Sequence, residues 1–152
     1  MDKELSFPKH RIKFLLLENI HQVAFERLRE AGYSVEGIGR SLPSEELLSE
    51  LRDVHVLGIR SKTKITREQI EGAKKLMAIG CFGVGTNQVD LGAATSAGIP
   101  VFNAPYGNTR SVAELAVGNI IALARKSADR NHKMHQGFWD KTAKGVHEVR
   151  DK

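Results

Sequence analysis

Between residues 12 and 103 the sequence alternates strand-like runs with segments of helical periodicity. Strands of few residues, rich in Leu, Ile and Val, are typical of a sheet that is covered on both faces. Their alternation with helices predicts an α/β fold, a flavodoxin-like, doubly wound and mainly parallel sheet over residues 1–107, whose strand order the sequence does not give. Strands are predicted at 12–17, 33–36, 54–59, 76–79 and 99–102, and helices at 21–31, 41–51, 66–75 and 91–97.

A different pattern begins at Ser111, which forms a predicted capping box with Glu114. The following stretch contains no Pro, and Gly118 is its one Gly before Gly137. The sequence therefore predicts one unbroken helix as far as Gln136. Such a helix would be about 39 Å long at 1.5 Å per residue. Its first half is apolar nearly all round, which predicts burial between two bodies.

Composition narrows the class of protein. The chain has 152 residues, a net charge of +5 and one cysteine, Cys81, which excludes an internal disulfide framework and favours a reducing compartment. Cys81 ends an apolar run, so we expect a buried filler. No apolar run is long enough for a membrane span, and no secretory signal is recognised, so we expect a cytoplasmic location and no membrane partner. The basic residues are scattered without aromatic interleaving, which argues against nucleic acid.

The carboxyl ends of parallel strands are where ligands bind in such sheets. The third predicted strand is followed by Arg60-Ser61-Lys62-Thr63-Lys64, whose three cations and two hydroxyls are suited to an anion. The fourth is followed by Gly83-Val84-Gly85, which is either a tight turn or a cup of backbone amides for an oxygen anion. Asn108 precedes the long helix, where free amides favour an anion. We therefore expect one crevice for a small acid. The six histidines show no spacing typical of a metal site, so no metal is expected.

The glycine pair at 83 and 85 does not complete a dinucleotide fingerprint. The third glycine of that motif would stand where this chain has Gln88, and the next strand ends at Asn103 rather than at an acid. We therefore do not expect this loop to cradle the phosphates of a nucleotide.

Several motifs together resemble one known family. They are IRSKTKIT at 59–66, IGCFGVGTNQVDL at 79–91, AGIPVFNAP at 97–105, NTRSVAEL at 108–115 and HQGFWDK at 135–141. The chain resembles the N-terminal part of the D-isomer-specific 2-hydroxyacid dehydrogenases. The resemblance implies an oxidoreductase that moves hydride between NAD and C2 of a small acid, with 3-phosphoglycerate, at the start of serine synthesis, as the expected substrate. It implies a homo-oligomer in which residues 108–152 form an interdomain helix and the start of an incomplete nucleotide-binding domain.

The resemblance also implies roles for single residues. Arg60 and Ser61 would bind the substrate anion, and Asn108 would lie at the hinge near the reaction centre. Gly83, Val84 and Gly85 would face the substrate carboxylate and the nicotinamide, which makes Val84 a cofactor contact as well. Trp139 and Lys141 would reach a neighbouring subunit.

The chain departs from the family pattern in ways that bear on activity. The complete GxGxxG and the catalytic His, its acidic partner and a further Arg are not among these 152 residues. No catalytic residue is therefore assigned, the full NAD site is not expected here, and the chain alone is expected to be inactive. Two alternatives stay open: a family member acting on another 2-hydroxy or 2-oxo acid such as hydroxypyruvate, and a non-catalytic flavodoxin-like interaction module.

Overall fold

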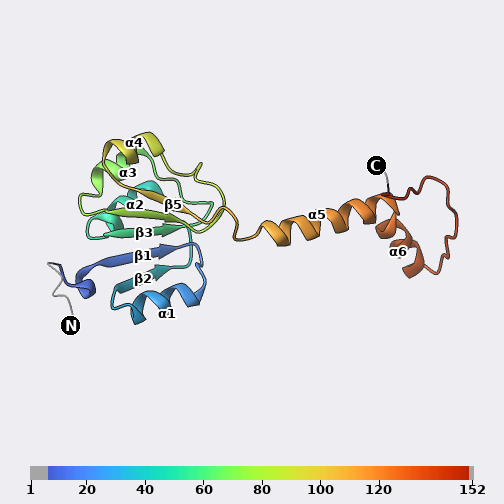
Figure 1. Ribbon diagram of the computed structural model, residues 1–152, viewed down its shortest axis with the longest axis horizontal. Helices are drawn as coiled ribbons and strands as arrows, with labels where there is room; N and C mark the ends of the chain where they lie inside the picture. The colour runs from blue at the N-terminus through green and yellow to red at the C-terminus, as the bar shows by residue number, and fades with distance from the viewer. Residues whose placement is uncertain (1–6, 151–152) are drawn as a thin grey trace. The chain divides into compact units, whose positions relative to one another are not determined.

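The computed structural model describes residues 7–150, and the chain divides into two compact units, Met1–Gly107 and Asn108–Lys152. The first unit contains a sheet of five strands in the order β2-β1-β3-β4-β5, in which every neighbouring pair is parallel (Figure 1). This is the order of flavodoxin-like sheets, so the predicted fold class is confirmed. The strands are β1 Lys13–Leu17, β2 Ser34–Ile38, β3 Val56–Ile59, β4 Ala78–Cys81 and β5 Val101–Asn103.

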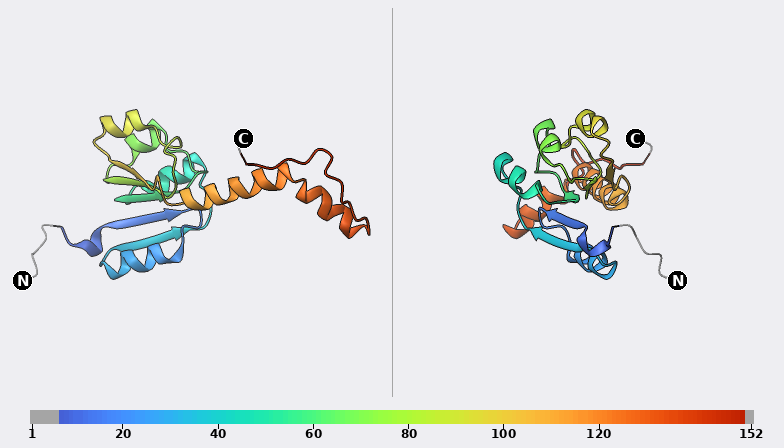
Figure 2. Two further views of the ribbon diagram at one scale, coloured as in Figure 1. Left: turned by 45° about the vertical axis from the view of Figure 1, so that its right-hand side comes forward. Right: turned by 90° about the vertical axis from the view of Figure 1, so that its left-hand side faces the viewer.

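Helices cover the two faces of this sheet unequally (Figure 2). The single helix α1, Gln22–Glu30, packs beside a small cluster built on Leu16, Ile20 and Val35. The larger core includes Leu57 and Ile79 from the sheet, and residues of the helices that follow β2, β3 and β4. These helices are α2 Ser44–Leu51, α3 Arg67–Gly72 and α4 Leu91–Ser96, and a short 3-10 helix, η1 Lys9–Arg11, precedes β1.

The caps of these helices follow the sequence signals. Thr66 and Gln69 form a capping box at the start of α3, and the Asp90 carboxylate accepts a hydrogen bond from the Ala93 N–H at the start of α4. Gly32 follows the C-cap of α1 with φ +91°, a backbone conformation that glycine adopts without strain. These signals fix where each helix begins and ends, and therefore where the connecting loops leave the sheet.

Residues 108–150 contain two helices, α5 Thr109–Ala124 and α6 Ser127–His135, so the prediction of one unbroken helix to Gln136 is wrong. The helical conformation is interrupted at Lys126, whose φ of +53° lies in the left-handed region. The break frees the Ala124 carbonyl, which accepts a hydrogen bond from the His147 N–H at 2.9 Å. Non-glycine residues seldom adopt this conformation, and no Gly or Pro near Lys126 in the sequence indicates a break.

The predicted capping box of Ser111 and Glu114 is also not formed. The N-cap is Asn108, three residues before Ser111, and Glu114 instead accepts a hydrogen bond from Arg110 Nε at 2.8 Å. None of the residues of α5 is buried in this chain, although burial was expected for its apolar surface. Within residues 7–150, no helix is long and apolar enough to cross a membrane.

Candidate functional site

The Arg60 loop, residues 60–64, leaves the carboxyl end of β3, as predicted. The side chains of Arg60, Ser61 and Lys62 are exposed, so their charges and hydroxyl are available to a ligand. A surface pocket of about 420 Å³ opens at this edge of the sheet. It is lined by Glu18, Asn19, Gly39, Arg40, Ser41, Arg60, Ser61 and Lys62.

Glu18, the first residue after β1, was not singled out as a site residue in the sequence analysis, but it contacts the Arg60 loop. It is only 7% exposed, and its carboxylate accepts three backbone hydrogen bonds from the Arg60 loop. Oε1 accepts from the N–H of Thr63 at 2.8 Å and of Arg60 at 3.3 Å, and Oε2 accepts from the N–H of Lys62 at 2.9 Å. The sequence did contain one indication of this role. Glu18 directly follows a buried strand, and the carboxyl ends of parallel strands lie at one edge of the sheet.

These contacts decide the charge of Glu18. Burial raises its pKa, but the nearby Thr63 hydroxyl and the N–H groups of Lys62, Thr63 and Arg60 lower it by more, and the net pKa lies below the ordinary value of 4.5. The Thr63 hydroxyl is buried without a hydrogen bond of standard geometry. Glu18 is therefore an ionised acceptor at neutral pH, and its negative charge faces backbone N–H groups.

The glycine loop, residues 83–85, follows β4, and all three residues are exposed. Of the three N–H groups of this loop, that of Gly83 donates to the Cys81 carbonyl at 2.8 Å. The N–H groups of Val84 and Gly85 have no hydrogen-bond partner among residues 7–150. A Cβ atom added at Gly83 would meet nothing within 4 Å, so open space lies in front of this backbone. The loop can thus offer two amides to an oxygen anion.

Gln88 explains why this loop is not a dinucleotide fingerprint. Its side chain is 6% exposed, and Nε2 donates to the carbonyl oxygens of Arg60 at 2.7 Å and Gly85 at 3.3 Å. The position that a fingerprint needs free for close approach of a helix is therefore filled by an amide that joins two loops. The described residues do not fit the pyrophosphate of NAD at this loop.

The end of β5 is joined to the glycine loop as well. Asn103 Nδ2 donates to the Val84 carbonyl at 2.7 Å, and the Ala104 N–H donates to the Gly83 carbonyl at 2.9 Å. Asn103 thus has a structural contact where a dinucleotide site would carry an acid. Arg60 and Ser61 follow β3, and Gly83, Val84 and Gly85 follow the neighbouring strand β4, so both loops lie at the same edge of the sheet. The pocket at the Arg60 loop is not lined by the glycine loop, so the predicted single crevice stays a prediction.

Cys81 is 3% exposed, and burial raises the pKa of its thiol, which keeps it protonated. It packs in the larger core, as predicted for a filler. Among residues 7–150, no group of three or more His, Cys, Asp or Glu side chains is arranged to hold a metal ion.

Asn108, Trp139 and Lys141 belong to the second unit. The Asn108 side chain makes no cap hydrogen bond, although its carbonyl accepts from the Val112 N–H at 3.0 Å. Trp139 is 67% exposed. The place of Asn108 near the substrate and the subunit contacts of Trp139 and Lys141 stay predictions.

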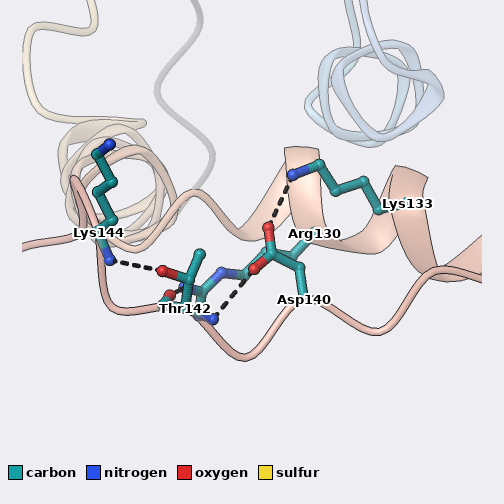
Figure 3. A network of polar contacts seen from close by, with 5 residues as sticks. All are labelled: Arg130, Lys133, Asp140, Thr142 and Lys144. Carbon is teal, nitrogen blue, oxygen red and sulfur yellow. Dashed lines mark hydrogen bonds and ion pairs between the residues drawn. The ribbon is translucent and has the colours of Figure 1, made fainter.

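A polar network holds the segment that carries Trp139 and Lys141 against α6 (Figure 3). Asp140, between them, accepts from Lys133 Nζ at 2.7 Å and from the Thr142 N–H at 3.0 Å. Arg130 donates to the Thr142 carbonyl, and the Lys144 N–H donates to the Thr142 hydroxyl at 3.2 Å. The network lowers the pKa of Asp140, chiefly through the Lys133 hydrogen bond. It anchors the segment while the two neighbouring side chains stay exposed.

Known proteins of similar sequence cover the whole of this chain. The chain is 52% identical over 152 residues to a D-3-phosphoglycerate dehydrogenase of Dictyostelium discoideum, covering 100% of this chain and 37% of the relative. It is 51% identical over 150 residues to the enzyme of that name from Escherichia coli, covering 98% of this chain and 37% of the relative. The chain thus spans a little over a third of the length of these relatives.

Solved structures share the fold. A protein of Thermus thermophilus matches with a TM-score of 0.77 and 31% identity, over 89% of this chain and 45% of that one. An NAD-bound 3-phosphoglycerate dehydrogenase of Entamoeba histolytica matches with a TM-score of 0.67 and 29% identity, over 76% of this chain and 40% of that one.

The sequence pattern of the D-isomer specific 2-hydroxyacid dehydrogenase catalytic domain matches residues 14–149, which is most of the chain. Binding of NAD is a property of this group of enzymes, as the NAD-bound structures among the matches record. The resemblance seen in the sequence motifs is thereby confirmed, and the chain belongs to the D-isomer-specific 2-hydroxyacid dehydrogenase family.

Proposed function

We propose that this chain is the N-terminal, substrate-binding part of an NAD-dependent D-3-phosphoglycerate dehydrogenase of the cytoplasm. The observation that carries the proposal is the exposed Arg60 loop at the carboxyl edge of the sheet, in a chain about half identical to dehydrogenases of that name. In the intact enzyme, C2 of the substrate would lose a hydride to NAD and its hydroxyl would lose a proton. The residues for that chemistry are not assigned in this chain.

The proposed substrate carries a carboxylate and a phosphate, and the first unit offers groups for two anions. Arg60 and Lys62 present exposed cations to the pocket, and the N–H groups of Val84 and Gly85 are free. Arg40 also lines the pocket, but its guanidinium is paired with the Glu46 carboxylate, at 2.5 Å for the shorter contact. We therefore assign anion binding to Arg60 and Ser61, with the glycine loop facing the carboxylate.

The NAD site is not assigned to the described residues, because Gln88 and Asn103 occupy positions that a dinucleotide fingerprint needs. Val84 is half exposed beside the free amides, and we propose it as a neighbour of the nicotinamide only. For the second unit we propose that Asn108 lies at the hinge and that Trp139 and Lys141 contact the neighbouring subunit of a homo-oligomer. The exposed Trp139 supports that role, since aromatic side chains are enriched in interfaces.

Calorimetric titration of the 152-residue chain with 3-phosphoglycerate tests the assignment. We expect Arg60→Ala to weaken binding at least tenfold, since a hydrogen bond to a charged group contributes about 1.5–3 kcal/mol. Arg67→Ala is the matched control, because Arg67 is exposed on α3 and forms an ion pair with Glu71 of the same helix. Equal affinity of the wild type and Arg60→Ala would remove Arg60 from the site.

Glycerate separates the phosphorylated substrate from the alternative acids. It keeps the carboxylate and the C2 hydroxyl of the proposed substrate and lacks the phosphate. We expect weaker binding of glycerate than of 3-phosphoglycerate. Equal binding of the two would favour a family member that acts on an unphosphorylated acid.

A further inference from the structure

We propose that Glu18 is a positioning residue that holds the Arg60 loop in its binding conformation, and that Gln88 transmits this order to the glycine loop. The proposal deepens the proposed function and rests on it for its meaning, because the order of these loops matters only if they bind a ligand. Neither residue is assigned to direct contact with the substrate.

The arrangement around Glu18 accounts for the order of the loop. Three of the loop's N–H groups converge on one carboxylate, at 2.8, 2.9 and 3.3 Å. Hydrogen bonds to a charged acceptor are stronger than those to a neutral one. These bonds tie the backbone of Arg60, Lys62 and Thr63 to one buried carboxylate, while the side chains of Arg60, Ser61 and Lys62 stay exposed.

The backbone of Glu18 adds two further ties. Its N–H donates to the Ile38 carbonyl at 3.0 Å, at the end of β2, and its carbonyl accepts from Arg60 Nη1 at 3.4 Å. Glu18 and Asn19 both have left-handed backbones, with φ of +62° and +53°. Two consecutive non-glycine residues in this region persist only where the surroundings fix them. Glu18 thus connects the ends of β1, β2 and β3.

Gln88 carries the connection to the loop that follows β4. Its side chain bonds the carbonyls of Arg60 and Gly85, and its own carbonyl accepts from the Ile65 N–H at 2.8 Å. The Asp90 N–H then donates to the Ile65 carbonyl at 2.8 Å, which continues the pairing of the two loops. The Arg60 loop and the glycine loop are therefore joined by hydrogen bonds through Gln88.

Glu18 is a positioning residue and not a catalytic one, because both carboxylate oxygens face amides and the side chain is buried. A general base needs an oxygen free to take a proton from a ligand. The proposal therefore concerns the shape of the site and not proton transfer.

Amide hydrogen exchange of the 152-residue chain tests the order of the loop directly. In Glu18→Gln, which keeps the shape and removes the charge, we expect exchange at Lys62 and Thr63 to rise ten- to a hundredfold, as for the loss of a hydrogen bond to a charged group. Exchange at Leu57 and Ile79 in the core of the sheet should stay unchanged. Glu71→Gln is the matched control, since Glu71 is exposed on α3 and forms an ion pair with Arg67 of the same helix. Unchanged exchange at Lys62 and Thr63 would overturn the proposal.

A second variant keeps the test decisive if Glu18→Gln does not fold. Glu18→Asp keeps the charge on a side chain one methylene shorter, so we expect a smaller rise in exchange at the same two amides. The same variants report on function through their affinity for 3-phosphoglycerate. We expect Glu18→Gln to weaken it about tenfold and Glu18→Asp to restore part of that loss. A purely structural role would give equal affinities in the variants that fold, and that result would contradict positioning.

Amide exchange and affinity for 3-phosphoglycerate distinguish a failure of the positioning role from a failure of the proposed function. If neither the wild type nor any variant binds 3-phosphoglycerate, the proposed function is contradicted, while the exchange data still decide whether Glu18 orders the loop. If the wild type binds and Glu18→Gln binds equally well with unchanged exchange, the positioning role alone is overturned.

Discussion

At the scale of single residues, the most consequential side chain is Glu18, a buried acid whose charge is stabilised by backbone N–H groups. Its pKa is lower in the folded chain than the ordinary 4.5, against the effect of burial. Ionised Glu18 therefore stabilises the fold fully above about pH 4.5. That stabilisation is lost as the pH falls below this value and through the lower pKa of the folded state.

This linkage gives a prediction for stability against pH. We expect the free energy of unfolding of Glu18→Gln to be lower than that of the wild type at pH 7, and the difference to shrink below about pH 4.5. Urea denaturation at a series of pH values measures it. Glu71→Gln serves as the comparison with an exposed acid, for which little change is expected. A difference between wild type and Glu18→Gln that stays constant from pH 7 to pH 3 would contradict the assignment.

A second prediction concerns the open backbone at Gly83. An added methyl group meets no atom within 4 Å there, and the φ of Gly83 is not left-handed, so Gly83→Ala should change stability by less than about 0.5 kcal/mol. The methyl group would stand in the space that we assign to the ligand, so we expect weaker binding of 3-phosphoglycerate in calorimetric titration. Gly58→Ala is the contrast, because its Cβ would lie 2.5 Å from Leu16 Cδ2 in the core. Full affinity in Gly83→Ala would place the ligand elsewhere.

At the scale of elements, the strand and helix segments of the first unit follow from periodicity, because each has a face that must be buried. The predicted positions shift by about two residues at the fourth and fifth strands, where apolar residues of the preceding loop extend the pattern. The break between α5 and α6 was missed, because it depends on a left-handed Lys126 and on the distant His147. Arg60 and Ser61 could be singled out from their place after a strand. Gln88 could not be, because its two partners are brought to it only by the fold.

The break itself is testable. At a left-handed position glycine is free of the strain that a side chain causes, so Lys126→Gly should leave the two-helix unit as stable or raise its stability by up to about 1 kcal/mol. Inside a continuous helix the same change would cost about 1 kcal/mol. Ala122→Gly, within α5, is the control that should show this cost. Carbon chemical shifts and thermal unfolding measure both variants, and a loss of stability in Lys126→Gly would favour the unbroken helix.

At the scale of the whole molecule, the second unit carries exposed large apolar side chains, among them Leu115, Leu123, Phe138 and Trp139. We proposed that Trp139 contacts a second copy. Removal of a central aromatic side chain from an interface typically costs 2 kcal/mol or more. Trp139→Ala should therefore raise the dissociation constant of a dimer about thirtyfold or more in sedimentation experiments. Tyr106→Ala is the control, an exposed aromatic residue outside the proposed contact. Unchanged association in Trp139→Ala would exclude this contact.

The whole chain is also the level at which catalytic activity is predicted. The sequence contains no complete dinucleotide fingerprint, and the described residues do not form one at the glycine loop. We expect the 152-residue chain to show no turnover in an assay that follows NADH with 3-phosphoglycerate. Turnover above background would show that the chain holds a cofactor site and a base that were not identified.

The most direct test of the central claim is an NMR map of 3-phosphoglycerate binding on the 152-residue chain. If the first unit recognises the substrate anion, the largest shifts will fall on the amides of residues 60–63 and of Val84 and Gly85, and they will vanish in Arg60→Ala. Shifts confined to other parts of the chain, or a shift pattern that survives in Arg60→Ala, would contradict the account.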